Sequence, residues 1–133
     1  NSATRAATQE GVVPSGGTAF LRLRDAVDRA AATMDDLDEI IGAQIVSRAL
    51  AAPARQIATN AGYDPAVVVA QVEREVGAVG FNAVTGKCED LTKAGIIDPA
   101  MVTRAALQNA ASVAALILTT ECIISDTTEK SNG

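Results

Sequence analysis

The sequence contains no histidine and no tryptophan, and its three aromatic residues are Phe20, Tyr63 and Phe81. Without histidine, the chain can form neither a Ser-His nor a Cys-His catalytic pair, and it offers no imidazole to a metal ion. So few aromatic rings also leave too few platforms for stacking the bases of single-stranded nucleic acid. These absences exclude several common classes of hydrolase, metalloprotein and nucleic-acid-binding protein.

Cysteine, positive charge and long apolar runs are also scarce. Cys88 and Cys122 are too few for a disulfide framework in a chain of 133 residues, which indicates a reducing compartment. The formal net charge of -5 argues against binding to a phosphate backbone. The most apolar segment, residues 113–124, is interrupted by polar residues and falls short of the roughly 20 apolar residues that span a bilayer. We therefore expect a soluble, intracellular protein with neither a nucleic-acid nor a membrane partner.

Most of the sequence shows the spacing of apolar residues that is typical of helices. Residues 3–10 are expected to end a helix, and apolar positions recur at helical spacing across residues 20–31, opposite a charged face. A longer helix is expected over residues 33–62. Its start resembles a capping box that begins at Thr33, and Pro53 is expected to kink or restart it.

Two Asp-Pro dipeptides predict further helix starts, because Asp is a good N-cap residue and Pro fits the first helical turn. Asp64-Pro65 is expected to open a helix that reaches Val76, and Asp98-Pro99 to open one that reaches about Thr119. Apolar residues cover nearly the whole circumference of this last helix, which predicts a buried, central position.

Short segments fill the remaining sequence. Residues 77–88 contain three glycines and predict a small β-hairpin around residues 84–87. Residues 12–18, with one proline and two glycines, predict a loop. Residues 122–125 predict an exposed edge strand, whose unpaired backbone groups are expected to pair with another strand. Residues 127–133 predict a disordered polar tail.

Three places in this pattern can do more than fold. Around Gly16, free backbone N–H groups at a helix start can hold an anion such as phosphate, although the segment matches no established phosphate-binding motif. Asn82 lies beside a tight turn, where it either contacts a ligand or bonds its own backbone. Asp98 either contacts a ligand or only caps a helix. Neither cysteine has an obvious activating base, so residue types and spacing alone leave the function open.

Five segments, however, resemble in order and spacing the C-terminal part of group I chaperonins, the GroEL family. They are residues 3–7 (ATRAA), 10–17 (EGVVPSGG), 80–86 (GFNAVTG), 94–99 (AGIIDP) and 102–114 (VTRAALQNAASVA). The resemblance continues through residues 118–122 (LTTEC) to about residue 126. It implies that residues 1–126 form a mainly α fold, half of the multihelical equatorial domain, with a small β-hairpin and a C-terminal edge strand.

The resemblance also implies a function. Members of this family form heptameric rings that use ATP, with a lid co-chaperonin, to fold unfolded polypeptides in the bacterial cytoplasm or in organelles of bacterial origin. Carried over by motif, the backbone of Gly16 lies against the nucleotide, Asn82 and Ala83 contact the base, Ile96 packs against it, and Asp98 accepts hydrogen bonds from the ribose hydroxyls. ATP would bring Mg²⁺ and K⁺, whose ligands lie outside this chain.

The same resemblance implies contacts between rings and between subunits. The expected contacts to the opposite ring are made by Arg55, Asp64, Ala66 and Val67, and the last strand is expected to join an inter-subunit sheet.

Departures from the family pattern limit these implications. Ser15 replaces a glycine, and the sequence lacks the Gly-Asp-Gly-Thr-Thr phosphate-binding segment, the aspartate that activates water and the substrate-binding apical domain. Whether the chain takes part in catalysis therefore stays open, and hydrolysis by these residues alone is not expected. The rival hypothesis is a non-catalytic helical interaction module that keeps the fold without binding nucleotide.

Overall fold

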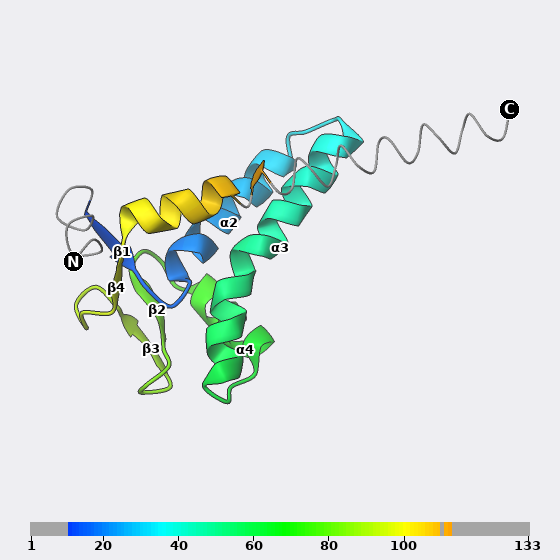
Figure 1. The fold of residues 1–133 in the computed structure, drawn as a ribbon. Coiled ribbons are helices and arrows are strands. Elements are labelled where there is room, and N and C mark those ends of the chain that lie inside the picture. Colours follow the sequence, from blue (N-terminus) through cyan, green and yellow to red (C-terminus); the bar gives the residue numbers. More distant parts are fainter. Residues whose placement is uncertain (1–10, 110, 113–133) are drawn as a thin grey trace, which may run out of the picture.

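A computed structural model describes residues 11–109 and 111–112 of the chain. Its elements are β1 (Val12–Pro14), α2 (Thr18–Ala31), α3 (Leu37–Asn60), α4 (Pro65–Arg74), β2 (Val79–Asn82), β3 (Lys87–Asp90) and β4 (Ile97–Pro99), followed by a helix over residues 100–109 (Figure 1). The predicted mainly helical class with small strands is confirmed. The predictions for residues 3–10, 122–125 and 127–133 lie outside the described residues.

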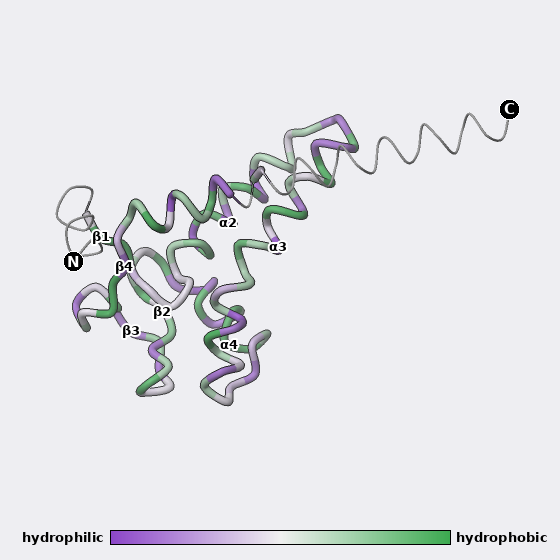
Figure 2. Tube along the Cα trace, in the orientation of Figure 1, coloured by the Kyte–Doolittle hydropathy of each residue, from purple (hydrophilic) through white to green (hydrophobic). Residues whose placement is uncertain are grey.

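The core lies where α2, α3 and α4 meet β2. Its buried residues are Leu21, Ala51, Ala54, Ala58, Val68, Val69, Val72 and Phe81. The three alanines form one stripe along α3, since their spacing of three and four residues returns them to the same helix face. Figure 2 shows hydrophobic and hydrophilic residues alternating along α3, as this one-sided packing requires. Small side chains let the neighbouring elements approach closely, so the core needs only one aromatic ring.

The approach of α2 to α3 depends on Gly17, the N-cap residue of α2. Its φ of 77° lies in the left-handed region that favours glycine. A Cβ at this position would stand 2.5 Å from the backbone nitrogen of Ala54. The glycine therefore sets both the turn into α2 and its distance from α3.

The start of α3 differs from the prediction. Asp36, not Thr33, is the N-cap residue, and its side chain accepts hydrogen bonds from the backbone N–H groups of Asp38 and Glu39. The Thr33 hydroxyl instead donates to the carbonyl of Ala30, at the end of α2. The predicted capping box at Thr33 is therefore wrong, because the helix begins three residues later, at the cap Asp36. α3 also runs through Pro53 without restarting.

The corner between α3 and α4 forms as its residues indicate. Gly62, with φ of 83°, follows the last turn of α3, and the N–H of Tyr63 reaches back to the carbonyl of Ala58 at 2.9 Å. These are the features of a Schellman motif, in which a left-handed glycine ends a helix. Asp64 then caps α4, with Pro65 in the first turn, so this predicted start is confirmed.

Two pairs of strands complete the fold. β2 and β3 form the predicted antiparallel hairpin, with Phe81 opposite Cys88. The predicted loop at residues 12–18 is partly wrong, because β1 pairs antiparallel with β4 and places Val13 opposite Asp98. Local signals could not reveal this strand, since its hydrogen-bonding partner lies far away in the sequence.

The helix over residues 100–109, yellow in Figure 1, lies at the surface of the described structure. Met101 is 41% exposed and Val102 54%, whereas Thr103 is buried. The predicted burial on all sides is therefore wrong for this part of the helix, because the elements described here contact only one side of it. No helix in the described ranges is long and apolar enough to cross a membrane.

Candidate functional site

The pairing of β1 with β4 brings together three of the predicted site residues. Val13 lies opposite Asp98 in the ladder, and the N–H of Ser15 donates to the carbonyl of Ile96 at 3.0 Å. The turn that contains Gly16 follows directly. Gly16, Ile96 and Asp98 therefore belong to one corner of the fold, although most of the chain separates the first from the other two.

The same turn lies against the end of β2. Gly16 has φ of 68°, and a Cβ there would stand 3.3 Å from the carbonyl oxygen of Phe81, the residue before Asn82. The left-handed backbone and this close approach both require glycine, so no ligand is needed to explain the residue. Behind it, the buried side chain of Thr18 occupies the space that a Cβ on Gly80 would need, and its hydroxyl has no partner in the described structure.

Asp98 differs from the capping residue Asp64, which precedes proline in the same way. The carboxylate of Asp64 accepts hydrogen bonds from the backbone N–H groups of Ala66 and Val67. Asp98 instead lies within β4 and is half-buried, and its carboxylate has no hydrogen bond or ion pair among the described residues. The cap interpretation of Asp98 is therefore wrong in this structure. Its oxygens remain available to accept hydrogen bonds.

Asn82 is 6% exposed, and its side chain is already engaged. Its amide oxygen accepts a hydrogen bond from the N–H of Val84 at 3.0 Å, and its amide nitrogen donates to the carboxylate of Glu89 at 2.8 Å. These contacts are those of a turn residue that fastens its own hairpin. One N–H of the amide remains unused, and the half-buried Ala83 follows directly.

The residues predicted to contact the opposite ring lie around the α3–α4 corner, where Arg55, Asp64, Ala66 and Val67 are all exposed. A shallow groove of about 380 Å³ runs beside them, lined by Arg48, Ala52, Arg55, Gln56, Thr59 and Pro65. The structure thus brings Arg55 close to the start of α4. Nothing in the described structure tests a contact with another subunit.

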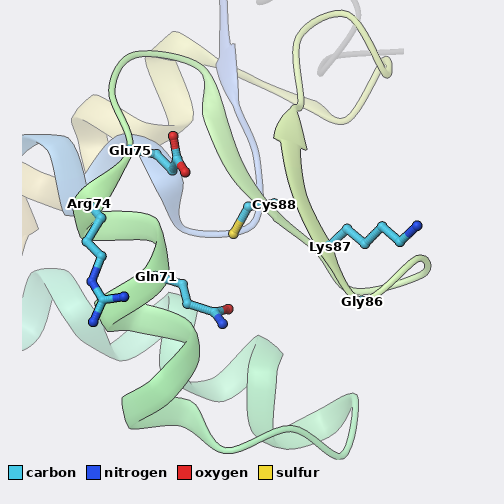
Figure 3. A pocket seen from close by; sticks show the side chains of 6 residues that line it. All are labelled: Gln71, Arg74, Glu75, Gly86, Lys87 and Cys88. Atoms are coloured by element: carbon cyan, nitrogen blue, oxygen red, sulfur yellow. The ribbon is translucent and has the colours of Figure 1, made fainter.

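A second cavity, of about 370 Å³, lies between α4 and β3 and was not predicted (Figure 3). It is lined by Gln71, Arg74, Glu75, Gly86, Lys87 and Cys88. Burial raises the pKa of the Cys88 thiol, the Glu75 carboxylate raises it further, and Arg22 opposes both. The thiol is therefore protonated at neutral pH, unlike an activated nucleophile. Within the described ranges, no three Cys, Asp or Glu side chains cluster as metal ligands.

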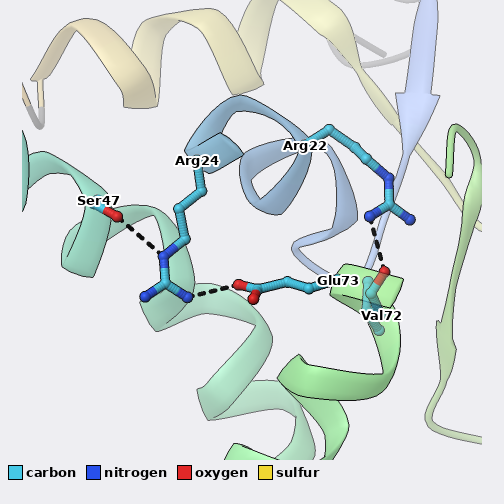
Figure 4. A network of polar contacts seen from close by, with 5 residues as sticks. All are labelled: Arg22, Arg24, Ser47, Val72 and Glu73. Atoms are coloured by element: carbon cyan, nitrogen blue, oxygen red, sulfur yellow. Dashed lines mark hydrogen bonds and ion pairs between the residues drawn. The ribbon is translucent and has the colours of Figure 1, made fainter. Parts of the chain in front are cut away.

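Sequence reasoning missed a network of arginines that holds β2 in place (Figure 4). The Arg22 guanidinium on α2 donates to the carbonyls of Val72, Gly77 and Val79, and burial lowers its pKa. Arg24, two residues further along α2, donates to the hydroxyl of Ser47 and forms a 2.6 Å ion pair with Glu73. The sequence shows these arginines only as part of a charged helix face, because their acceptors lie on other elements.

The chain is similar to known chaperonins in both sequence and structure. The family model described as the TCP-1/cpn60 chaperonin family matches residues 1–128. An open-state monomer of a group II chaperonin from Methanococcoides burtonii aligns with a TM-score of 0.75 and 24% identity, over 85% of this chain and 29% of that one. A group III chaperonin in the open state aligns with a TM-score of 0.76 and 31% identity, over 86% of this chain and 24% of that one. The chain thus spans less than a third of either structure, and its equatorial-domain fold is confirmed.

Proposed function

The chain belongs to the TCP-1/cpn60 chaperonin family, and from this we propose that it forms part of an ATP-dependent chaperonin subunit that assists the folding of unfolded polypeptides. Within that subunit it lines the base and ribose side of the nucleotide site. The proposal includes group I membership, which the sequence motifs favour, although the two solved structures described above belong to groups II and III.

The observation that carries this proposal is the unpartnered carboxylate of Asp98 beside the Gly16 turn. A carboxylate has two acceptor oxygens, which suits the two vicinal hydroxyls of a ribose. The β1–β4 pairing sets Asp98 opposite Val13, three residues before Gly16, whose missing side chain would let a ligand approach the backbone. Ile96, half-buried at the same corner, offers apolar surface for the base. Phosphate, Mg²⁺ and K⁺ would be held by residues outside this chain, so we assign no hydrolytic step to it.

The engaged side chain of Asn82 is the observation that favours a second candidate function, one without nucleotide binding. Because its side chain is engaged with Val84 and Glu89, it can contact a base only through its remaining amide N–H, or the backbone at Ala83 must serve instead. The alternative is a helical interaction module that keeps the fold and binds no nucleotide. The unpartnered Asp98 favours the ATP site over this alternative.

The proposal extends to the assembly. In heptameric rings, the exposed guanidinium of Arg55, together with Asp64, Ala66 and Val67, would meet the opposite ring, as the resemblance implies. The lid co-chaperonin and unfolded polypeptides would bind through other parts of the subunit. The bacterial cytoplasm, or an organelle of bacterial origin, would be its compartment.

Substitution of Asp98 tests the ATP site directly. In the full-length subunit, Asp98→Ala should weaken ATP binding about tenfold or more, the range expected when hydrogen bonds to a charged group are lost. Asp28→Ala, which removes an exposed carboxylate from α2, should leave the Kd unchanged. An unchanged Kd for Asp98→Ala would refute the ribose role. Absence of ATP binding by the unsubstituted subunit would favour the interaction module.

A further inference from the structure

Tyr63 joins two parts of the fold that the sequence keeps separate. The Schellman end of α3 fixes its backbone, because its N–H donates to the Ala58 carbonyl and left-handed Gly62 precedes it. The next residue, Asp64, caps α4. With the chain fixed on both sides, the Tyr63 ring is presented from a rigid corner and not from a loose loop.

The ring contacts the β2–β3 hairpin at two points. It meets the ring of Phe81 edge to face, with the centroids 5.0 Å apart and the planes at 76°. Its hydroxyl end covers Gly86, the turn residue with φ of 74°. The three atoms nearest to where a Cβ on Gly86 would stand all belong to Tyr63. Tyr63 therefore holds one residue at each end of the segment that contains Asn82 and Ala83.

The turn itself has little other support from the helices. Val84, at its tip, is 92% exposed, and these hydrogen bonds of Asn82 run to Val84, Gly86 and Glu89, all within the hairpin. These bonds give the hairpin its shape, but they do not fix where it lies against the helical core. Arg22 anchors the start of β2 to α2, and at the turn end of the hairpin the anchor is Phe81 with the Tyr63 ring packed upon it.

We propose that Tyr63 is a positioning residue for the nucleotide base, because it clamps Phe81 and Gly86 and so sets where Asn82 and Ala83 lie relative to the Gly16 turn. This inference rests on the proposed ATP site. It adds a residue with no contact to the nucleotide, on a different element from the predicted base contacts. The consequence is that Tyr63 governs discrimination between adenine and other bases more than overall stability.

The test measures binding of ATP and of GTP to the full-length subunit. Tyr63→Ala should weaken ATP binding about two- to tenfold, the range that one edge-to-face aromatic pair is worth, and should lower the ratio of ATP to GTP affinity. Tyr63→Phe retains the ring and should restore both values. Val84→Ala, at the exposed tip, should change neither. Leu50→Ala, a buried change on α3, should lower the unfolding temperature while leaving the affinity ratio intact.

A second variant keeps the inference testable if Tyr63→Ala folds poorly. Gly86→Ala should weaken ATP binding more strongly in the Tyr63 protein than in a Tyr63→Phe background, since a Cβ there collides first with the Tyr63 hydroxyl. Additive effects, or an unchanged ATP to GTP ratio in Tyr63→Ala, would overturn the role of Tyr63. If that happens while Asp98→Ala still weakens ATP binding, the ATP site stands without it. If Asp98→Ala has no effect, both proposals fail.

Discussion

The Nη1 atom of Arg22 on α2 donates to the carbonyl oxygen of Val72, near the end of α4, at a distance of 2.8 Å. The same guanidinium reaches the carbonyls of Gly77 and Val79. It therefore supplies donors and positive charge to the last turn of α4, where helix carbonyls lack partners. Through this one side chain, α2 fixes the path of the chain from α4 into β2.

Replacement of Arg22 should loosen that path. Arg22→Leu removes the side-chain donor of three carbonyls, of which that of Val72 keeps the backbone N–H of Glu75, and we expect it to lower the local free energy of unfolding by about 2–3 kcal/mol. Arg22→Lys should recover only part of this, because an ammonium group cannot reproduce the planar fork. Hydrogen exchange of the amides at residues 72–79 measures the effect. Arg29→Ala, which breaks an exposed pair with Asp25, should cost only about 0.3 kcal/mol and serves as the control.

Gly17 and Gly11 form a matched pair, since both have positive φ but only Gly17 lies against another backbone. Gly11→Ala should cost about 1–2 kcal/mol from backbone strain alone. Gly17→Ala should cost clearly more, because its Cβ must also displace α2 from Ala54. Thermal unfolding of both variants compares them. Equal costs would show that the close approach of α2 to α3 contributes nothing.

The two Asp-Pro dipeptides should respond differently to substitution. Asp64→Ala removes the N-cap of α4 and should cost about 1 kcal/mol of stability. Asp98→Ala removes a carboxylate without a hydrogen bond in the described structure and should change stability by less than about 0.5 kcal/mol. Unfolding of both variants without nucleotide gives the comparison. A large loss for Asp98→Ala would reveal a structural role and would weaken its use as a test of ATP binding.

Cys88 should react slowly with iodoacetamide. Its pKa is raised, so at pH 7.5 the thiolate is rarer than in a free cysteine, and the rate should rise only at a higher pH. Glu75→Gln should accelerate the reaction, because it removes a carboxylate that raises this pKa. Mass mapping of the alkylated peptides separates Cys88 from Cys122. A rate at pH 7.5 equal to that of free cysteine would contradict the raised pKa.

The raised pKa of the Cys88 thiol also makes the free energy of unfolding depend on pH. The folded state holds the Cys88 thiol in its neutral form more firmly than the unfolded state does. This contribution is present below the pKa of the unfolded thiol, about 8.5, and is lost as the pH rises through the higher folded value. Cys88→Ala should therefore flatten the decline of the unfolding temperature in mildly alkaline solution.

Local chemistry made part of this fold predictable from the sequence. The cap at Asp64, the glycine that ends α3 and the turn between β2 and β3 each depend on residues within about six positions, so their signals are complete in a short segment. The start of α3 shows the limit of such signals. Thr33 and Asp36 are both good caps, and only the packing of the helix decides between them.

The candidate site was harder to predict from physical reasoning. The strand at Val12 is too short to show a pattern, and its partner at Pro99 lies in a distant segment. The engaged amide of Asn82 depends on Glu89, across the hairpin. Residue types alone therefore marked candidate positions, while the proximity of Gly16, Ile96 and Asp98 in the fold required the tertiary structure. The resemblance to chaperonins, which depends on whole motifs, implied a specific role for each candidate residue, which the spacing of residue types did not.

The β1–β4 pair also determines when this corner can exist during synthesis. Val12 leaves the ribosome long before its partner Pro99, and a contact between such distant residues closes a large loop that forms slowly. Before this pairing forms, α2, α3 and α4 can already pack together, but Ile96 and Asp98 do not yet lie beside the Gly16 turn. A chain that ends before residue 95 should thus form the helical core while the Gly16 turn lacks Ile96 and Asp98, so the proposed ATP site depends on a segment that is translated after the helices that pack beside it.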